Sequence, residues 1–166
     1  MKSSTMVTRK LVQCELAGEV LRSSGNLRLR VTGHSMLPTD WPGDTLVVES
    51  VSGRDVSKGD IVLFSNGQRL VAHRLVTSNS ESENLIETQG DAVPRPDSPV
   101  IQSQLLGKVS SILRNGESIA PTRNLRFSQR AAATIFRRSD FAARVVVGVH
   151  GLRRNSSDQT SQVQTQ

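Results

Sequence analysis

Short aliphatic runs separated by turn signals are the feature that most constrains the fold of this chain. The runs are rich in Val, Ile and Leu and are about 4–8 residues long, which is typical of strands and too short for helices. Glycine-containing or polar turns lie between them. The runs cover residues 26–31, 45–49, 60–64, 69–76, 84–88 and 105–113. The sequence therefore predicts a compact, mainly β domain.

A helical segment is predicted on each side of this β region. The first extends from about residue 7 to 22 and has apolar side chains at the spacing of an amphipathic helix. From residue 124 to 149, Arg residues alternate with Phe, Ala, Ile and Val, which predicts one or two basic amphipathic helices. Residues 155–166 are mostly Ser, Gln, Thr and Asn, a composition that predicts a disordered tail. The apolar positions of the first helix include Leu11, Cys14, Ala17 and Leu21.

The net charge of +6 comes from the last quarter of the chain. Residues 1–120 contain 13 Lys or Arg and 13 Asp or Glu, for a net charge of zero, whereas residues 121–166 contain 8 Arg and 2 Asp, for +6. This segment has three interpretations: a solvated helix packed on the β domain, a peripheral contact with anionic lipid, or a contact with phosphates. Because no aromatic residues are interleaved for base stacking, nucleic acid is not expected as a partner.

The sequence offers no sign of membrane insertion, export or disulfide formation. It lacks a run of about 20 apolar residues, and its start lacks the apolar stretch of a secretory signal. We therefore expect a cytoplasmic or peripherally membrane-associated protein, without a transmembrane segment or signal peptide. Cys14 is the single cysteine, so it excludes an internal disulfide, does not match a zinc site, and is expected in the core.

The residues around Ser35 are the strongest candidates for chemistry. Ser35 follows a glycine-containing turn at the end of the first aliphatic run, in the stretch Val-Thr-Gly-His-Ser-Met-Leu-Pro-Thr-Asp from 31 to 40. Such a turn can project the hydroxyl outward and leave the serine N–H facing a developing oxyanion. By itself, the stretch favours a solvated turn serine over a nucleophile. His34 is expected to point away from the site if the strand continues.

The motifs that follow Ser35 narrow the interpretation. Gly-Asp pairs at 43–44 and 59–60 introduce two of the runs, and His73 lies within the next run. Together with Gly-x-Ser-Met-x-Pro at 33–38, this order resembles the superfamily of signal peptidase I and the SOS repressors, serine proteases of the S24/S26 type. The resemblance covers about residues 26–113. It implies a serine endopeptidase that acts on a protein precursor with small side chains before the scissile bond, and it implies no cofactor and no metal.

The general base implied by the resemblance is His73. Bacterial signal peptidase I and the self-cleaving repressors use a lysine, whereas the endoplasmic-reticulum and archaeal enzymes use a histidine followed by arginine. This chain has His73-Arg74 at that place and no lysine between Lys58 and Lys108. The chemistry agrees, because imidazole accepts protons near neutral pH whereas lysine must first be desolvated. The resemblance therefore implies a Ser–His variant.

Two acidic residues, Asp91 and Asp97, are candidates for orienting His73. A carboxylate on the far ring nitrogen holds the imidazole tautomer and stabilises the imidazolium. The endoplasmic-reticulum type has a Gly-Asp segment with a second acid six positions later, and here 97 − 91 = 6. This match implies that Asp97 orients the base and that Asp91 supports it, although the sequence leaves open which of them does so. Asp44 and Asp60 are interpreted as structural residues of the turns that begin strands.

One departure from the family pattern keeps a second function open. Membrane-bound signal peptidases usually carry Ser where this chain has Gly33, so the backbone N–H of Ser35 is the one oxyanion donor that we predict. The alternative is a self-processing or non-catalytic regulatory module that binds a membrane surface or a polyanion. Ala17-Gly18 resembles the bond that the repressors cut in themselves, but its place in the predicted helix favours a packing role.

The predicted organisation has four parts. They are an N-terminal helix at 1–25, a serine peptidase catalytic domain at 26–120, a basic amphipathic helical extension at 121–154 and the disordered tail at 155–166.

Overall fold

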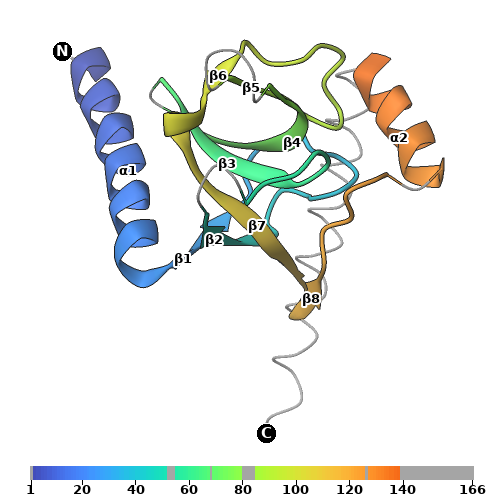
Figure 1. The fold of residues 1–166 in the computed structure, drawn as a ribbon, viewed down its shortest axis with the longest axis horizontal. Helices are drawn as coiled ribbons and strands as arrows, with labels where there is room; N and C mark the ends of the chain where they lie inside the picture. Colours follow the sequence, from blue (N-terminus) through green and yellow to red (C-terminus); the bar gives the residue numbers. More distant parts are fainter. Residues whose placement is uncertain (1, 52–54, 68, 80–84, 126, 139–166) are drawn as a thin grey trace, which may run out of the picture.

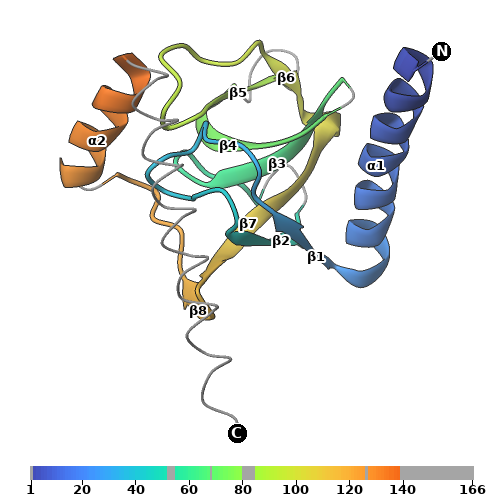
Figure 2. The same ribbon diagram turned by 180° about the vertical axis from the view of Figure 1, so that it is seen from behind.

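The computed structural model describes residues 2–51, 55–67, 69–79, 85–125 and 127–138. In these residues, eight antiparallel strands form one curved sheet, with a helix at each side of it (Figures 1 and 2). The strand order is β1-β2-β7-β3-β4-β5-β6, and β8 pairs with β7. The prediction of a mainly β domain is therefore confirmed. The elements are α1 (Lys2–Ser24), β1 (Asn26–Arg30), β2 (Thr45–Ser50), β3 (Ile61–Asn66), β4 (Arg69–Asn79), β5 (Leu85–Gln89), β6 (Val100–Ile101), the 3₁₀ turn Gln102–Gln104, β7 (Leu105–Arg114), β8 (Glu117–Ile119) and α2 (Phe127–Arg138).

The six aliphatic runs correspond to β1, β2, β3, β4, β5 and β7. Two very short strands, β6 and β8, lie outside the predicted runs, because two or three residues are too few to produce a pattern. β8 is exposed along its length and follows β7 through a tight turn. In that turn, Asn115 and Gly116 both have positive φ, 52° and 84°, as a two-residue hairpin of this kind requires.

Helix α1 packs one face against the sheet and leaves apolar residues exposed on the other. Leu21 is 1% exposed and joins the core cluster that contains Leu46 and Ile112. Cys14 is buried as expected, whereas Val12 and Leu16 are 52% and 60% exposed. The apolar stripe is thus wider than the surface that it contacts. A bilayer-spanning helix is absent from the described part of the chain.

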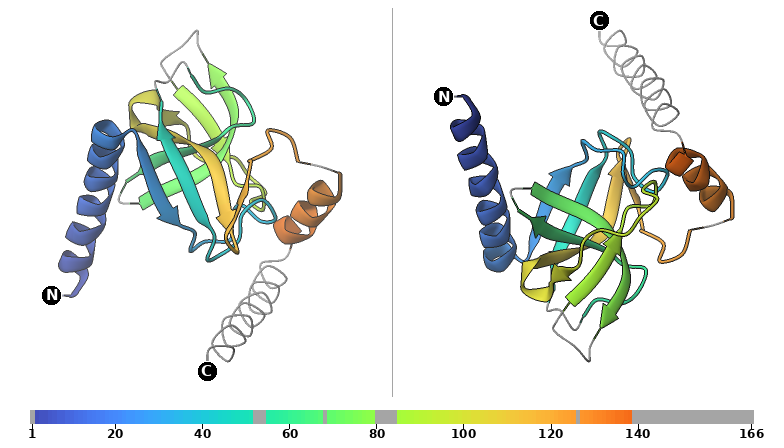
Figure 3. Two further views of the ribbon diagram at one scale, coloured as in Figure 1. Left: turned by 90° about the horizontal axis from the view of Figure 1, so that it is seen from below. Right: turned by 90° about the horizontal axis from the view of Figure 1, so that it is seen from above.

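Helix α2 lies on the other side of the molecule from α1 (Figure 3). Its Phe136 packs with the fully buried Leu37, and Trp41, Ala92 and Ala132 complete this small cluster. The helix is thereby fastened to the segment that follows β1 and to the segment that follows β5. The rest of the predicted basic extension, residues 139–154, and the predicted tail lie outside the described residues.

Candidate active site

The segment that carries Ser35 is a tight turn between β1 and β2. Leu37 N–H donates to the His34 carbonyl at 3.3 Å, and Thr39 N–H donates to the Met36 carbonyl at 2.8 Å. Met36 and Leu37 are buried and anchor the turn in the core, whereas Ser35 is half-buried. β1 ends at Arg30, so the strand alternation expected to direct His34 away does not reach it. His34 is instead an exposed residue at the start of the turn.

The structure brings Ser35, His73 and Asp97 into one hydrogen-bonded chain. His73 lies on β4 opposite Val62 of β3 and is 7% exposed. Its Nε2 is 2.9 Å from Ser35 Oγ, and its Nδ1 is 2.6 Å from Asp97 Oδ2. This is the order nucleophile, base and orienting acid that acyl-transfer chemistry requires.

Asp97 is placed by contacts with β5. Thr88 Oγ1 donates to Asp97 Oδ2 at 2.7 Å, and Asp97 N–H donates to the Thr88 carbonyl at 2.8 Å. Sequence reasoning missed Thr88, although it is fully buried and shares a face of its strand with Ile86. A hydroxyl on the inward face of a predicted strand, near a candidate acid, is the signal that could have found it.

The residues just after β5 approach the nucleophile closely. Ala92 N–H donates to the Ser35 carbonyl at 2.8 Å. A Cβ atom added at Gly90 would lie 2.6 Å from that carbonyl oxygen and 3.1 Å from His73 Nε2. Only glycine therefore allows the segment just after β5 to pass this close to Ser35 and His73.

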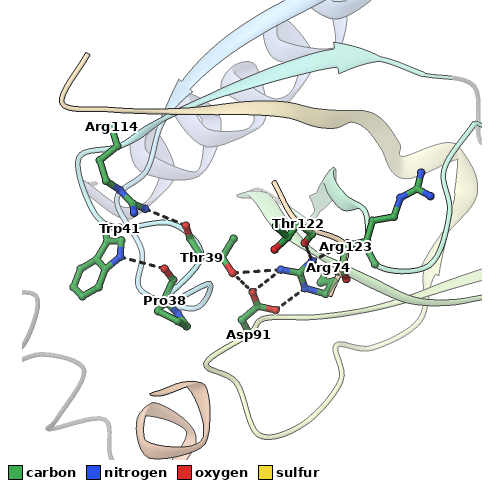
Figure 4. A network of polar contacts seen from close by, with 9 residues as sticks. Pro38, Thr39, Trp41, Arg74, Asp91, Arg114, Thr122 and Arg123 are labelled. Atoms are coloured by element: carbon green, nitrogen blue, oxygen red, sulfur yellow. Dashed lines mark hydrogen bonds and ion pairs between the residues drawn. The ribbon is translucent and has the colours of Figure 1, made fainter. Parts of the chain in front are cut away.

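Asp91 lies with Arg74 and not with the imidazole. Arg74 Nε donates to Asp91 Oδ1 and Nη2 to Oδ2, both at 2.8 Å, and Thr39 Oγ1 also donates to Oδ2. Arg74 Nη1 donates to the carbonyls of Gly59 and Thr122, each at 2.7 Å (Figure 4). One guanidinium thus joins β4, the Ser35 turn, the segment after β5 and the segment before α2.

A second arginine holds the same turn from the other side. Arg114, at the end of β7, pairs with Asp44 Oδ2 at 2.7 Å and donates from Nη2 to the Thr39 carbonyl at 3.0 Å. Asp44 is fully buried and also accepts a hydrogen bond from Trp41 N–H at 2.8 Å. Asp60 has a comparable place before β3, since it accepts from Ser57 N–H and pairs with Arg123 at 2.7 Å.

The charges around the turn leave one carboxyl in an unusual state. Burial raises the pKa of Asp40 to about 7, and the neighbouring carboxylates of Asp44 and Asp91 act in the same direction.

No cluster of three or more His, Cys, Asp or Glu suited to a metal ion occurs in the described ranges. The site is therefore a serine on a turn held by two ion pairs, an imidazole on β4 and a carboxylate on the loop after β5.

Comparison with known protein families finds a match for more than half of the chain. A family described as Peptidase S24-like matches residues 5–97, which include the Ser35 turn, β4 and the loop that carries Asp97. A comparison with curated proteins finds no match.

Proposed function

Because the chain belongs to the Peptidase S24-like family, we propose that it is a serine endopeptidase of signal-peptidase type that cleaves a peptide bond in a protein precursor. Ser35 is the nucleophile, His73 the general base and Asp97 the orienting acid. The observation that carries the proposal is the His73 ring, whose two nitrogens lie 2.9 Å from Ser35 Oγ and 2.6 Å from Asp97 Oδ2. Asp91 supports the site indirectly, through Arg74 and Thr39.

In the acylation step, Ser35 Oγ attacks the scissile carbonyl carbon and its proton passes to His73 Nε2. Asp97 accepts the Nδ1–H hydrogen bond and stabilises the imidazolium that forms. The Ser35 N–H faces the developing oxyanion, and it donates to no atom of the residues that the structure describes. His73 then protonates the leaving amine, the C–N bond breaks, and an ester to Ser35 remains.

In the deacylation step, His73 takes a proton from water, and the oxygen of that water attacks the ester carbonyl. The C–O bond to Ser35 breaks, the proton returns to Ser35 Oγ, and the new carboxylate leaves. The same residue thus acts as base and then as acid in each half of the reaction.

The alternative is a self-processing or non-catalytic regulatory module. It draws support from Gly33, which has no side chain to offer as a second oxyanion donor. Against self-cleavage, the Ala17-Gly18 bond lies within α1, where both residues are buried. The bond could reach Ser35 only if the helix unwound or if another copy cut it.

The test is cleavage of a peptide library, read by mass spectrometry, together with the intact mass of the protein. We expect wild type to cut in trans after small residues, and Ser35→Ala and His73→Ala to lose all cuts. His34→Ala is the matched control, because this exposed histidine adjoins the nucleophile without contacting it, and its cleavage should remain. Cuts confined to the chain itself would favour self-processing, and cuts that persist in Ser35→Ala would refute the proposed nucleophile.

We also propose that the basic extension makes a peripheral contact with anionic lipid, through the cluster of arginines after residue 121. Flotation with vesicles should then recover the chain with anionic lipid at low salt and release it at high salt. Binding to neutral vesicles alone, or no binding to either, would contradict this proposal.

A further inference from the structure

Asp40 is a buried acid next to the nucleophile turn that the proposed chemistry does not use. Asp40 is only 2% exposed. Its backbone N–H donates to the Met36 carbonyl at 3.3 Å, and this hydrogen bond closes the turn that carries Ser35. The Asp40 carboxyl makes no hydrogen bond to any residue that the structure describes. A buried carboxylate without such partners is strongly disfavoured, whereas the neutral acid is tolerated.

The charges near Asp40 are balanced without it. Arg74 and Arg114 are the cations that act on it, and they are already paired with Asp91 and Asp44 at 2.8 Å and 2.7 Å. Ionised Asp40 would therefore add a third carboxylate to two carboxylates and two guanidiniums. On the side of α2, the packing at the turn is made by apolar Ala132 and Phe136. The pKa of Asp40 lies at about 7 because burial and the two carboxylates outweigh the two arginines.

We propose that Asp40 is a positioning residue that makes the Ser35 turn sensitive to pH, so that its ionisation displaces the turn and lowers peptidase activity on the alkaline side. The route is short. Thr39, the residue before Asp40, is held through its hydroxyl by Asp91 and Arg74 and through its carbonyl by Arg114. An ionised Asp40 competes for both guanidiniums and draws them away from Thr39. The activity part of this inference rests on the proposed function, whereas the movement of the turn does not.

The turn carries its own reporter, because Trp41 is the single tryptophan of the chain and contacts the turn through Nε1 and the Pro38 carbonyl at 3.2 Å. In a Ser35→Ala chain, we expect the Trp41 emission to titrate with a midpoint near pH 7, and Asp40→Asn to abolish that change. Asp40→Ser serves the same purpose if the amide variant folds poorly. Two controls, Asp55→Asn at an exposed site and His73→Gln, should keep the titration. A titration unchanged by Asp40→Asn, or no titration at all, overturns the inference.

The second measurement is the pH profile of kcat/KM for a cleaved peptide. We expect wild type to lose about tenfold in kcat/KM for each pH unit above the Asp40 transition, and Asp40→Asn to remain active there. An alkaline limb that is identical in both chains overturns the inference. If the Trp41 emission titrates in the Ser35→Ala chain and not when Asp40→Asn is added, but wild type cuts no peptide at any pH, the movement of the turn is upheld and the proposed function is refuted.

Discussion

Removal of Arg74 from its buried ion pair with Asp91 should strongly destabilise the candidate site. The side chains of the two residues are 12% and 3% exposed, and the pair is bidentate. Arg74→Leu would leave a buried carboxylate with Thr39 but without its cation, and it would also leave the carbonyls of Gly59 and Thr122 without this donor. Removing one partner of a buried pair costs about 3–5 kcal/mol, a large part of the roughly 5–15 kcal/mol that holds a domain folded.

The assay is urea unfolding at neutral pH in a Ser35→Ala background. We expect the free energy of unfolding to fall by about 3–5 kcal/mol in Arg74→Leu. Part of that loss should be recovered in Arg74→Leu/Asp91→Asn, because Asn carries no charge that needs Arg74. The matched control is Arg22→Leu, which breaks an exposed pair with Glu19 and should cost less than about 1 kcal/mol. If Arg74→Leu lowers the free energy of unfolding no more than Arg22→Leu does, the buried ion pair does not stabilise the site as its geometry indicates.

Asp97→Asn should lower kcat by about 10³–10⁴-fold with little change in folding, because the imidazole loses its orienting acid. Steady-state kinetics and a thermal melt measure the two effects, and a loss in kcat under tenfold would contradict the role of Asp97. Gly90→Ala should abolish cleavage, because its Cβ would lie 2.6 Å from the Ser35 carbonyl, whereas Gly33→Ala, with nothing within 4 Å, should be tolerated; equal activity in the two variants would refute the argument. The pKa of Asp40 is about 7 in the folded chain and has its ordinary value of 3.8 in the unfolded chain, so the folded chain binds the proton more tightly. The free energy of unfolding should therefore fall by up to about 4 kcal/mol as the pH rises from about 4 to 7, and stay level above that. Unfolding curves across that range should lose this slope in Asp40→Asn, and a slope that persists would assign it to other groups.

The strands could be predicted from the sequence because their run length and Val, Ile and Leu content are local properties. The partners of the acids could not. Asp91 and Asp97 were both candidates at the right spacing, but the loop between them decides which one meets His73. Hydrogen bonds with Thr88 bring Asp97 back to β5, whereas Asp91 lies beside Arg74. These contacts join different strands and loops, 9 and 17 residues apart, and no periodicity of the sequence encodes them.

The same limit applies to the surface of α1 and to the state of Asp40. The helical spacing of α1 predicted its apolar positions, but it could not show that Leu16, which is 60% exposed, lies off the face that packs on the sheet. Nothing in the sequence around Asp40 marks its side chain as buried. It lies on the turn whose Leu37 packs with Phe136, from a helix almost a hundred residues later in the sequence.

Adjacent positions on β4 have different tasks, and this links the accuracy of folding to the chemistry. His73 shares a face with Val71 and Leu75, whereas Arg74 lies on the face of Leu70 and Ala72. A slip of one residue between β3 and β4 would turn the imidazole and the guanidinium each to the opposite face of the sheet. The misaligned chain would lose its base and, at the same time, move the Arg74 guanidinium away from the Asp91 carboxylate. The register of β4 that places the base is therefore also the one that forms the Arg74–Asp91 ion pair, and mispairing would remove both together.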